Sequence, residues 1–283
     1  MAKVIFIMST GRCSTQFLAR LLAKGDPDTL VVHEGAGPNF KPAQVFRNSS
    51  FEKTLAETHQ LRKLFGQIDT QLASGGRFIE TGWPAYGWGP YLQNRYGAEF
   101  GFVHLLRNPF ATAASMTTHA LLGDGDDTLS KHCIIRPHIE AVLYPEFQAD
   151  YAGFSYFERG LYHWLEVHSF LLEQSHGANF MGLFRFEDLY EPDSTATRDL
   201  WMRCGFDTAK FQELPPYDQF NARARRGYAM NNQKLLSLVW DLALQLGYDD
   251  DLLQRWSDID FLSDYFNKIR VPIARLPRRQ YRP

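Results

Sequence analysis

Short apolar runs alternate along this chain with longer stretches in which apolar residues recur every three or four positions. The short runs have the length and the β-branched and aromatic content of buried parallel strands. They lie at 3–8, 29–33, 77–81, 101–106 and 179–186. The longer stretches have the spacing of amphipathic helices. Strands that alternate with helices predict a three-layer α/β fold, in which helices flank a central, mostly parallel sheet of about five strands.

Several predicted helices carry further signals at their ends. Ser49 followed by Glu52 is typical of a capping box, and it predicts one long helix over 49–72. Pro109 suits the first turn of a helix, where its missing N–H group costs nothing. A strong helix is expected over 154–176, and three more are expected near 194–204, 232–246 and 259–269.

Two segments have no clear period. Residues 82–91 are rich in Gly and aromatic side chains, and they predict a loop. Residues 121–151 contain several Gly and Asp residues together with Pro137 and Pro145, so we expect an irregular excursion or lid there. No repeat and no interdomain linker stands out, and we expect residues 1–283 to form a single domain.

Composition narrows the range of partners. The 30 basic and 32 acidic residues give a net charge of −2, which points to neither nucleic acid nor an acidic membrane. Cys13, Cys133 and Cys204 are odd in number and far apart, as in a protein of the reducing cytoplasm. No apolar run is long enough to span a bilayer, and no spacing predicts a metal site. We therefore expect a cytoplasmic protein with no membrane span, no metal and no nucleic-acid partner.

The loop after the first predicted strand has the composition of a phosphate-binding loop. Ligands of an open parallel sheet bind beyond the carboxyl ends of the strands, where backbone N–H groups and a helix N-terminus attract anions. In this loop Arg12 supplies a cation, and Ser14, Thr15 and Gln16 supply hydrogen-bond donors. A Walker loop would need a Gly-Lys pair, which the sequence lacks, so hydrolysis of nucleoside triphosphates is disfavoured.

A second anion-binding group is predicted at the end of the fourth strand. Arg107 leaves the same edge of the sheet, and Ser115 follows two helical turns later. An Arg and a hydroxyl form a clamp for an anion, here on the neighbouring wall and separate from the first loop. Two clamps on one edge predict a ligand with two phosphate groups at different ends.

The first loop resembles the 5′-phosphosulfate loop of the sulfotransferase family, in which a basic residue, Ser, Gly and two hydroxyl residues follow a strand. On that match Arg12 takes the basic position, Cys13 the serine, Ser14 the glycine, Thr15 the first hydroxyl and Gln16 the second. The family uses 3′-phosphoadenosine 5′-phosphosulfate (PAPS) as donor and releases 3′,5′-adenosine bisphosphate (PAP). The resemblance implies a P-loop-like sulfotransferase fold and a PAPS donor, with no metal required.

Three further segments carry the same resemblance. Residues 106–115, with Arg107 and Ser115, closely resemble the family's 3′-phosphate motif. Residues 184–189 resemble a strand end of the family, and Arg225, Arg226 and Gly227 resemble its late basic loop over the 3′-phosphate. The resemblance therefore implies that the donor is bound by Arg107, Ser115, Arg225, Arg226 and Gly227.

The resemblance also guides the choice of catalytic residues. Arg12 is our candidate for stabilising charge on the leaving phosphate, because its charge is permanent. Glu34, at the end of the second strand, is the first choice for the general base, and a structural ion pair is its alternative role. His33 is the second choice, although adjacent strand residues point to opposite faces, so we do not expect both to face the donor. Glu80 is third and His119 fourth.

The acceptor is the least constrained part of the prediction. Trp83, Tyr86, Trp88 and Tyr91 either stack on an acceptor ring or plug the top of the sheet, and the sequence does not choose between these. A hydroxyl on a small molecule, a sugar or a lipid fits a carboxylate base. The alternatives are a P-loop-like small-molecule kinase and a degenerate nucleotide-binding protein without turnover. His163 and His168, on a mostly apolar helix, are interpreted as packing residues.

Overall fold

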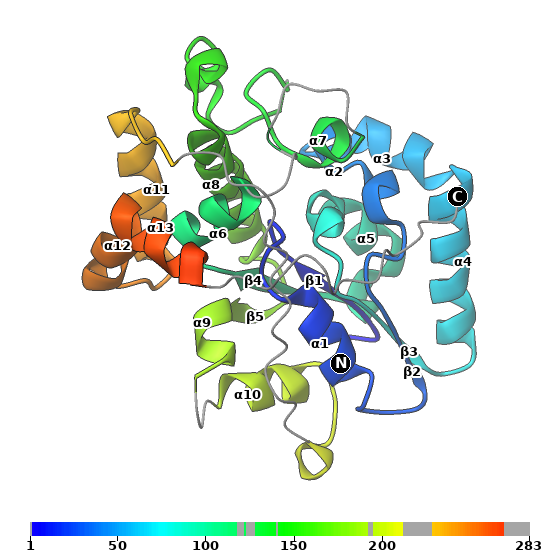
Figure 1. Ribbon diagram of the computed structural model, residues 1–283. Helices are drawn as coiled ribbons and strands as arrows, with labels where there is room; N and C mark the ends of the chain where they lie inside the picture. The colour runs from blue at the N-terminus through cyan, green and yellow to red at the C-terminus, as the bar shows by residue number, and fades with distance from the viewer. Residues whose placement is uncertain are drawn as a thin grey trace, which may run out of the picture.

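A five-stranded, all-parallel sheet forms the centre of the protein (Figure 1). The computed structural model describes residues 2–117, 122, 128–139, 141–191, 195–211 and 228–268. The strands are β1 (Val4–Met8), β2 (Thr29–Val32), β3 (Arg77–Glu80), β4 (Phe100–Leu106) and β5 (Phe180–Arg185), in the spatial order β2-β3-β1-β4-β5. The sequence-based prediction of a parallel α/β sheet is confirmed.

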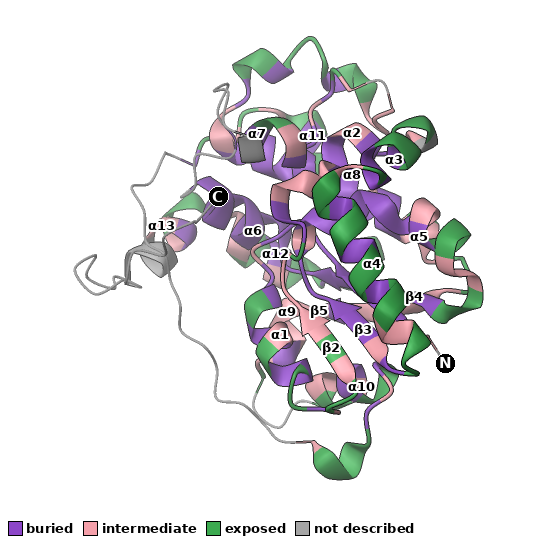
Figure 2. Ribbon diagram, turned by 90° about the vertical axis from the view of Figure 1, so that its right-hand side faces the viewer, coloured by how far each residue is buried: buried purple, intermediate pink, exposed green. Residues whose placement is uncertain are grey.

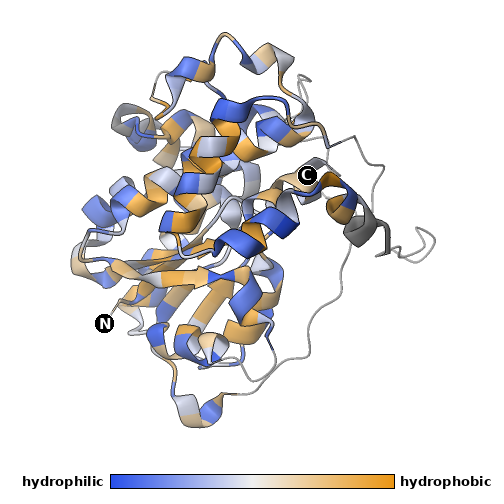
Figure 3. Cartoon of the chain, turned by 90° about the vertical axis from the view of Figure 1, so that its left-hand side faces the viewer, coloured by the Kyte–Doolittle hydropathy of each residue, from blue (hydrophilic) through white to orange (hydrophobic). Residues whose placement is uncertain are grey.

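Helices cover both faces of this sheet, as the sequence predicts. Along β1, Ile5 and Ile7 pack with α1 (Thr15–Leu22) and α10 (Ala196–Arg203) on one face. Val4, Phe6 and Met8 face the larger core against α4 (His59–Ala73) and α8 (Tyr156–Gln174). The strands are mostly hydrophobic (Figure 3), and the central strands β1 and β4 are buried along their whole length. The outer side of α4 carries the exposed residues (Figure 2).

The other helices lie around these layers. They are α2 (Pro42–Val45), α3 (Ser49–Ala56), α5 (Gly89–Tyr96), α6 (Pro109–Thr117), α7 (Thr128–Cys133), α9 (Phe186–Leu189), α11 (Gln233–Gln245), α12 (Asp250–Ser257) and α13 (Ile259–Lys268). Single 3₁₀ turns occur at Gly37–Phe40, Trp83–Trp88, Gly97–Glu99, Pro145–Phe147, Tyr151–Gly153 and Thr208–Lys210. Helix α6 begins at Pro109 as predicted, and α8 begins with a complete capping box between Ser155 and Glu158.

The long helix expected over 49–72 is wrong in one respect, because the chain breaks there into α3 and α4. Thr58 is extended, with ψ at 153°, and its hydroxyl donates to the carbonyl of Leu55 at 2.7 Å. Glu52 does not cap α3: its side chain is buried, and its carboxylate accepts a hydrogen bond from the backbone of Tyr91. Local side-chain hydrogen bonding by Thr overrides the helical period at the break.

The loop expected over 82–91 is also wrong, because this segment is a 3₁₀ turn that runs directly into α5. Pro84 and Pro90 occupy the first turns of the two elements, where a proline is tolerated. The aromatic side chains of this turn pack into the larger core, and tertiary packing therefore gives the Gly-rich segment a regular structure.

The excursion expected over 121–151 is anchored on α8 in its described part. Glu166 of α8 is fully buried, and its carboxylate accepts the N–H groups of Leu143 at 2.8 Å and Tyr144 at 2.9 Å. Ile135 donates its N–H to Nδ1 of His163 at 3.1 Å. Across the described ranges, no helix is both long and apolar enough to cross a membrane.

Candidate active site

The loop between β1 and α1 has an unusual backbone. Gly11, Arg12 and Ser14 all have positive φ, at 85°, 62° and 59°, and such a conformation is typical of loops whose backbone N–H groups bind anions. The N–H of Gly11 itself donates to the hydroxyl of Ser9 at 3.1 Å. The first N–H groups of a helix have no intrahelical acceptor. In α1, Leu18 donates its N–H to the carbonyl of Ser14 at 3.2 Å, and the N–H groups of residues 15–17 precede this bond. The loop therefore combines a turn of N–H groups with a helix N-terminus, as an anion site requires.

The side chains of this loop divide into two groups. Cys13 lies in the core with no exposed surface, its thiol donates to the carbonyl of Gly11 at 3.1 Å, and burial raises the pKa of Cys13 to about 12. Only its backbone can therefore face a ligand. Thr15 is buried at the start of α1, whereas Arg12 and Ser14 are partly exposed and Gln16 is exposed.

Arg12 joins the two predicted anion-binding groups. Its Nε donates to the hydroxyl of Ser115 at 2.9 Å, although 103 residues separate the two in sequence. Arg107 donates from Nη1 to the carbonyl of Arg12 at 3.0 Å. The pairing of β1 with β4, in which Met8 is the partner of His104, brings the two loops together. The two predicted anion-binding groups are therefore in direct contact and form one connected cluster.

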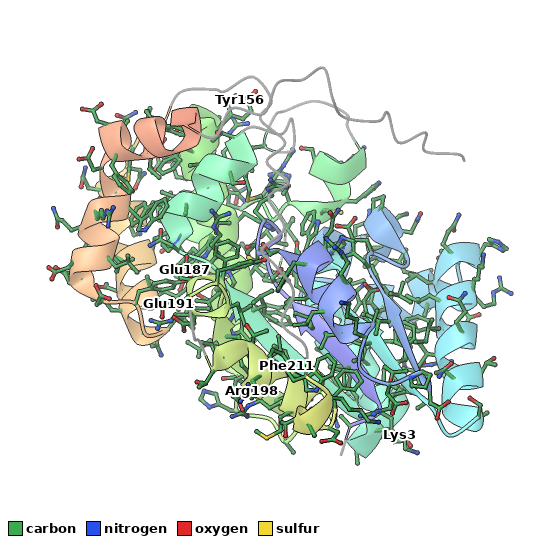
Figure 4. The ribbon with its side chains drawn as sticks, turned by 60° about the horizontal axis from the view of Figure 1, so that its bottom comes forward. Lys3, Tyr156, Glu187, Glu191, Arg198 and Phe211 are labelled. Carbon is green, nitrogen blue, oxygen red and sulfur yellow. The ribbon has the colours of Figure 1, made fainter. Side chains whose placement is uncertain are left out.

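Arg107 and the start of α6 are held by several contacts. The guanidinium carbon of Arg107 lies 4.4 Å from the ring centroid of Phe186, an attractive cation–π geometry. Asn108 accepts the N–H groups of residues 110 and 111 and so caps α6. The N–H of Asn108 donates to Glu187 at 2.9 Å, and Tyr248 donates its hydroxyl to the same carboxylate at 3.0 Å. Glu187 is labelled in Figure 4. Glu187 lies within residues 184–189, which resemble a strand end of the sulfotransferase family, but the sequence predicts no role for this residue by itself.

Glu34 and His33 lie on the same side of the chain, contrary to the expected alternation. Nε2 of His33 is 3.8 Å from Oε1 of Glu34, and Nδ1 of His33 is 3.2 Å from the hydroxyl of Thr81. The reason is local: β2 ends at Val32, and Glu34 has a φ of 54°. The rule that side chains alternate applies only within the strand.

Glu34 is close to the phosphate loop, as its electrostatic environment indicates. Burial raises the pKa of its carboxyl, and a hydrogen bond with Trp83 and the charge of Arg12 offset part of that rise. A carboxylate beside a permanent cation and with a raised pKa has the properties of a general base near neutral pH.

Glu80 is in a different situation from Glu34. It is fully buried at the end of β3, and its carboxylate accepts the N–H groups of Glu34 at 2.9 Å, Gly35 at 3.0 Å and Gly82 at 2.6 Å. Burial raises the pKa of Glu80 to about 7. With its oxygens engaged by the backbone, Glu80 is a structural carboxylate in this arrangement. His119, the fourth candidate, lies outside the described residues.

Among the predicted acceptor-binding aromatics, Trp83 lies beside the phosphate loop: a Cβ added to Gly11 would lie 3.0 Å from its ring. Tyr86 and Trp88 are fully buried and donate to the carbonyls of Cys133 and Phe40, so they plug the structure and have no surface for an acceptor. Tyr91 packs against Phe65 of α4, with ring centroids 5.3 Å apart.

Three buried histidines lie beneath the loop. Nε2 of His104 and Nδ1 of His168 are 2.8 Å apart, and Nε2 of His168 is 3.5 Å from the hydroxyl of Thr10. Burial lowers the pKa of His104 and of His163 to about 3, and it lowers that of His168 too. The histidines of α8 are packing residues, as interpreted from the sequence. Their contact with the loop, and His104 itself, were missed, because nothing in an apolar strand marks a polar partner on a distant helix.

The late basic loop of the predicted site cannot be placed. Arg225, Arg226 and Gly227 lie outside the described residues. Among the residues that are described, no three His, Cys, Asp or Glu side chains are grouped so as to hold a metal ion.

Comparison with known proteins yields two solved structures, and both are sulfotransferases by their descriptions. The sulfotransferase domain from the curacin biosynthetic pathway has 12% identity and a TM-score of 0.47, over 88% of this chain and 99% of that one. A sulfotransferase from Alicyclobacillus acidocaldarius has 15% identity and a TM-score of 0.45, over 93% of this chain and 99% of that one. No family model and no curated protein matches this sequence. At these identities and TM-scores the two likenesses assign this chain neither a family nor an activity.

Proposed function

We propose that this protein is a sulfotransferase that moves the sulfuryl group of PAPS to an acceptor hydroxyl. The single observation that carries the proposal is the cluster of Arg12, Ser115 and Arg107. Two motifs that resemble the phosphate-binding elements of sulfotransferases meet in it through contacts of 2.9 and 3.0 Å. A donor with a phosphosulfate at one end and a 3′-phosphate at the other fits a cluster with two guanidinium groups.

The proposed chemistry is an in-line displacement at sulfur, similar to phosphoryl transfer. The acceptor oxygen forms a bond to sulfur as the bond between sulfur and the bridging phosphate oxygen breaks, and the bridging electrons leave with PAP. Arg12 stabilises the charge that develops on that oxygen. The proton of the acceptor hydroxyl passes to the carboxylate of Glu34, whose raised pKa suits that transfer.

The same site can be used to weigh the other two candidate functions. A kinase of the P-loop type would need a lysine at the end of the loop, and this loop holds Ser14 and Thr15 there. A protein that binds nucleotide without turnover needs no base beside the loop. Here the carboxyl of Glu34 lies close enough to Arg12 for the charge of Arg12 to lower its pKa. Both observations favour a sulfotransferase with Glu34 as base.

The direct test is release of PAP from PAPS in the presence of phenols, sugars and aliphatic alcohols, with ATP and Mg²⁺ as the kinase control. We expect turnover with at least one acceptor, and a fall of about 10²- to 10⁴-fold in Glu34→Gln because the base is lost. PAP affinity should change by no more than about twofold, since Glu34 acts on the acceptor. An unchanged rate in Glu34→Gln would refute the base assignment. Phosphoryl transfer from ATP without any reaction of PAPS would favour a kinase.

A further inference from the structure

The turn that carries Glu34 is held by an uncommon arrangement of backbone and carboxylate. Glu34 has a φ of 54°, a left-handed conformation that is unfavourable for a non-glycine residue. Such a conformation persists only where the surroundings impose it. Here the N–H groups of Glu34 and Gly35 both donate to the carboxylate of Glu80, at 2.9 and 3.0 Å.

The same carboxylate also fixes the chain on the other side of the turn. Gly82 donates its N–H to Oε1 of Glu80 at 2.6 Å, and Trp83 follows directly, with its indole in a hydrogen bond to Glu34. Glu80 therefore ties the base-carrying turn to the segment that carries Trp83. The two segments follow neighbouring strands, since Val32 of β2 pairs with Glu80 of β3.

Two glycines make this close approach possible. A Cβ on Gly82 would lie 2.7 Å from both Cα and N of Glu34, and one on Gly35 would lie 2.9 Å from Oε2 of Glu80. Gly82 has an ordinary φ of −81°, so its missing side chain serves the contact with Glu34 and not a special backbone conformation. The backbone of residues 34–35 thus packs directly on the carboxylate and on residue 82.

We infer that Glu80 is a positioning residue, whose buried carboxylate holds Glu34 in its left-handed conformation and directs the Glu34 side chain toward Arg12 and Trp83. The inference rests on the proposed role of Glu34 as general base. It gives Glu80 no contact with substrate: Glu80 acts only through the three N–H groups that it accepts. Its removal should therefore affect the step that needs the base and leave donor binding unchanged.

The test compares two variants that loosen the turn in different ways. Glu80→Asp keeps the charge but withdraws the carboxylate by one methylene group, so it can no longer reach all its donors. Gly82→Ala keeps Glu80 and pushes directly on Glu34. We expect each to lower kcat for a phenol acceptor by about 10- to 100-fold, the scale of a misplacement near 1 Å, with KM for PAPS and the Kd of PAP unchanged.

A second readout needs no acceptor. The pKa of Glu34 can be followed by NMR on protein labelled with ¹³C at glutamate, with Glu34→Gln to assign the signal. Burial is the largest cause of its raised pKa, so a released Glu34 should titrate at a lower pH in both variants. The matched control is Glu166→Asp, which shortens another buried carboxylate that accepts two backbone N–H groups. This variant should lose comparable thermal stability and leave the Glu34 pKa unchanged.

The outcomes separate the two proposals. If Glu34→Gln keeps the wild-type rate, the base assignment fails whatever Glu80 does. If Glu34→Gln loses activity while Glu80→Asp and Gly82→Ala keep both kcat and the Glu34 pKa, the positioning role of Glu80 is refuted. In the background of Glu34→Gln, Glu80→Asp should cause no further loss of kcat, and an additive loss would show an independent effect. Should Glu80→Asp fail to fold, Gly82→Ala supplies the same comparisons.

Discussion

At the scale of single residues, three of the five described non-glycine residues with positive φ lie at the proposed site, and they are Arg12, Ser14 and Glu34. Arg12 and Glu34 both have positive φ, at 62° and 54°, although neither is a glycine. Each such residue costs about 1–2 kcal/mol and is retained where the surrounding contacts impose it. For Arg12 those contacts include Ser115 and Arg107, and for Glu34 they include Glu80. The positions of the two side chains that we assign to catalysis therefore depend on an unusual backbone conformation as well as on hydrogen bonds to neighbouring residues.

Gly11 allows a direct test of how closely the phosphate loop is packed. Its φ is 85°, and a Cβ there would lie 3.0 Å from the ring of Trp83. Gly75 is a matched control, with a φ of 81° and no atom within 4 Å of an added Cβ. We expect Gly75→Ala to cost about 1–2 kcal/mol of unfolding free energy from the left-handed backbone alone. Gly11→Ala should cost about 1–3 kcal/mol more, as overpacking does.

Urea denaturation of both variants provides the measurement, and PAP titration provides a second one. Gly11→Ala should also weaken PAP binding, because the loop must shift away from Trp83, whereas Gly75→Ala should leave PAP affinity unchanged. Equal stability losses in the two variants, with equal PAP affinities, would contradict the packing of Trp83 on this loop.

The sequence predicted residues at strand ends better than it predicted their partners. Arg12, Arg107 and Ser115 were expected near one edge of the sheet, and the contacts among them follow from the pairing of β1 with β4. The contacts of Glu80 could not be predicted from the sequence, because they depend on two glycines that allow the backbone to approach its carboxylate. The sequence does not decide whether Trp88 stacks on an acceptor or packs in the core, because an aromatic side chain in a Gly-rich segment is compatible with either role.

At the scale of elements, β4 and α8 meet through buried polar groups. His104 of β4 contacts His168 of α8, which in turn contacts Thr10 of the phosphate loop. A buried imidazole with a lowered pKa stays neutral, and it must take up a proton when the protein unfolds in acid. This pair of elements therefore makes the stability of the region beneath the loop dependent on pH.

The direction of this dependence follows from the lowered pKa. The pKa of His104 is about 3 in the folded protein against 6.5 for a free histidine. Its contribution to stability is fully present above pH 6.5 and is lost as the pH falls from 6.5 toward 3. Other groups oppose it: burial raises the pKa of Glu80 to about 7, and the stability from that group is lost as the pH rises toward 7. A single variant isolates one histidine from this background.

We expect the unfolding free energy of the wild type to fall more steeply between pH 6 and pH 4 than that of His104→Gln. The difference should be about 1.4 kcal/mol per pH unit, the value for one proton taken up on unfolding. Urea denaturation at a series of pH values measures both slopes, and the acidic groups common to both proteins cancel. Parallel slopes would show that His104 is protonated in the folded protein or accessible to water.

The pattern of elements was the most predictable part of the structure. Each of the five strands overlaps an apolar run, because a strand buried on both faces needs an uninterrupted run. The break at Thr58 was not predicted, since the apolar spacing continues from α3 into α4 and only a local hydrogen bond ends the first helix. The Gly and aromatic residues of 82–91 predict a loop, and the regular structure at Trp83–Trp88 comes from burial.

At the scale of the whole molecule, the sheet brings distant motifs to one place. Its order β2-β3-β1-β4-β5 puts β1 between the strand that leads to Glu80 and the strand that leads to Arg107. The proposed base follows β2, the leaving-group cation follows β1 and the 3′-phosphate arginine follows β4, so all three lie at the carboxyl edge of one sheet. Ligands of open parallel sheets bind at this edge, where the strand order reverses beside β1. The central claim is that this edge binds a nucleotide with phosphates at both its 3′ and 5′ positions.

Calorimetric titration of the full chain with PAP, with ATP and Mg²⁺ as the control ligand, tests this claim most directly. We expect micromolar binding of PAP and none of ATP. In Arg107→Ala the binding free energy should weaken by about 2–4 kcal/mol, because a charge-assisted contact to phosphate is lost. Arg203→Ala, which removes an exposed arginine of α10, is the control and should bind PAP like the wild type. Tight binding of ATP with no response to PAP, or PAP binding that is insensitive to Arg107→Ala, would contradict the proposed donor site.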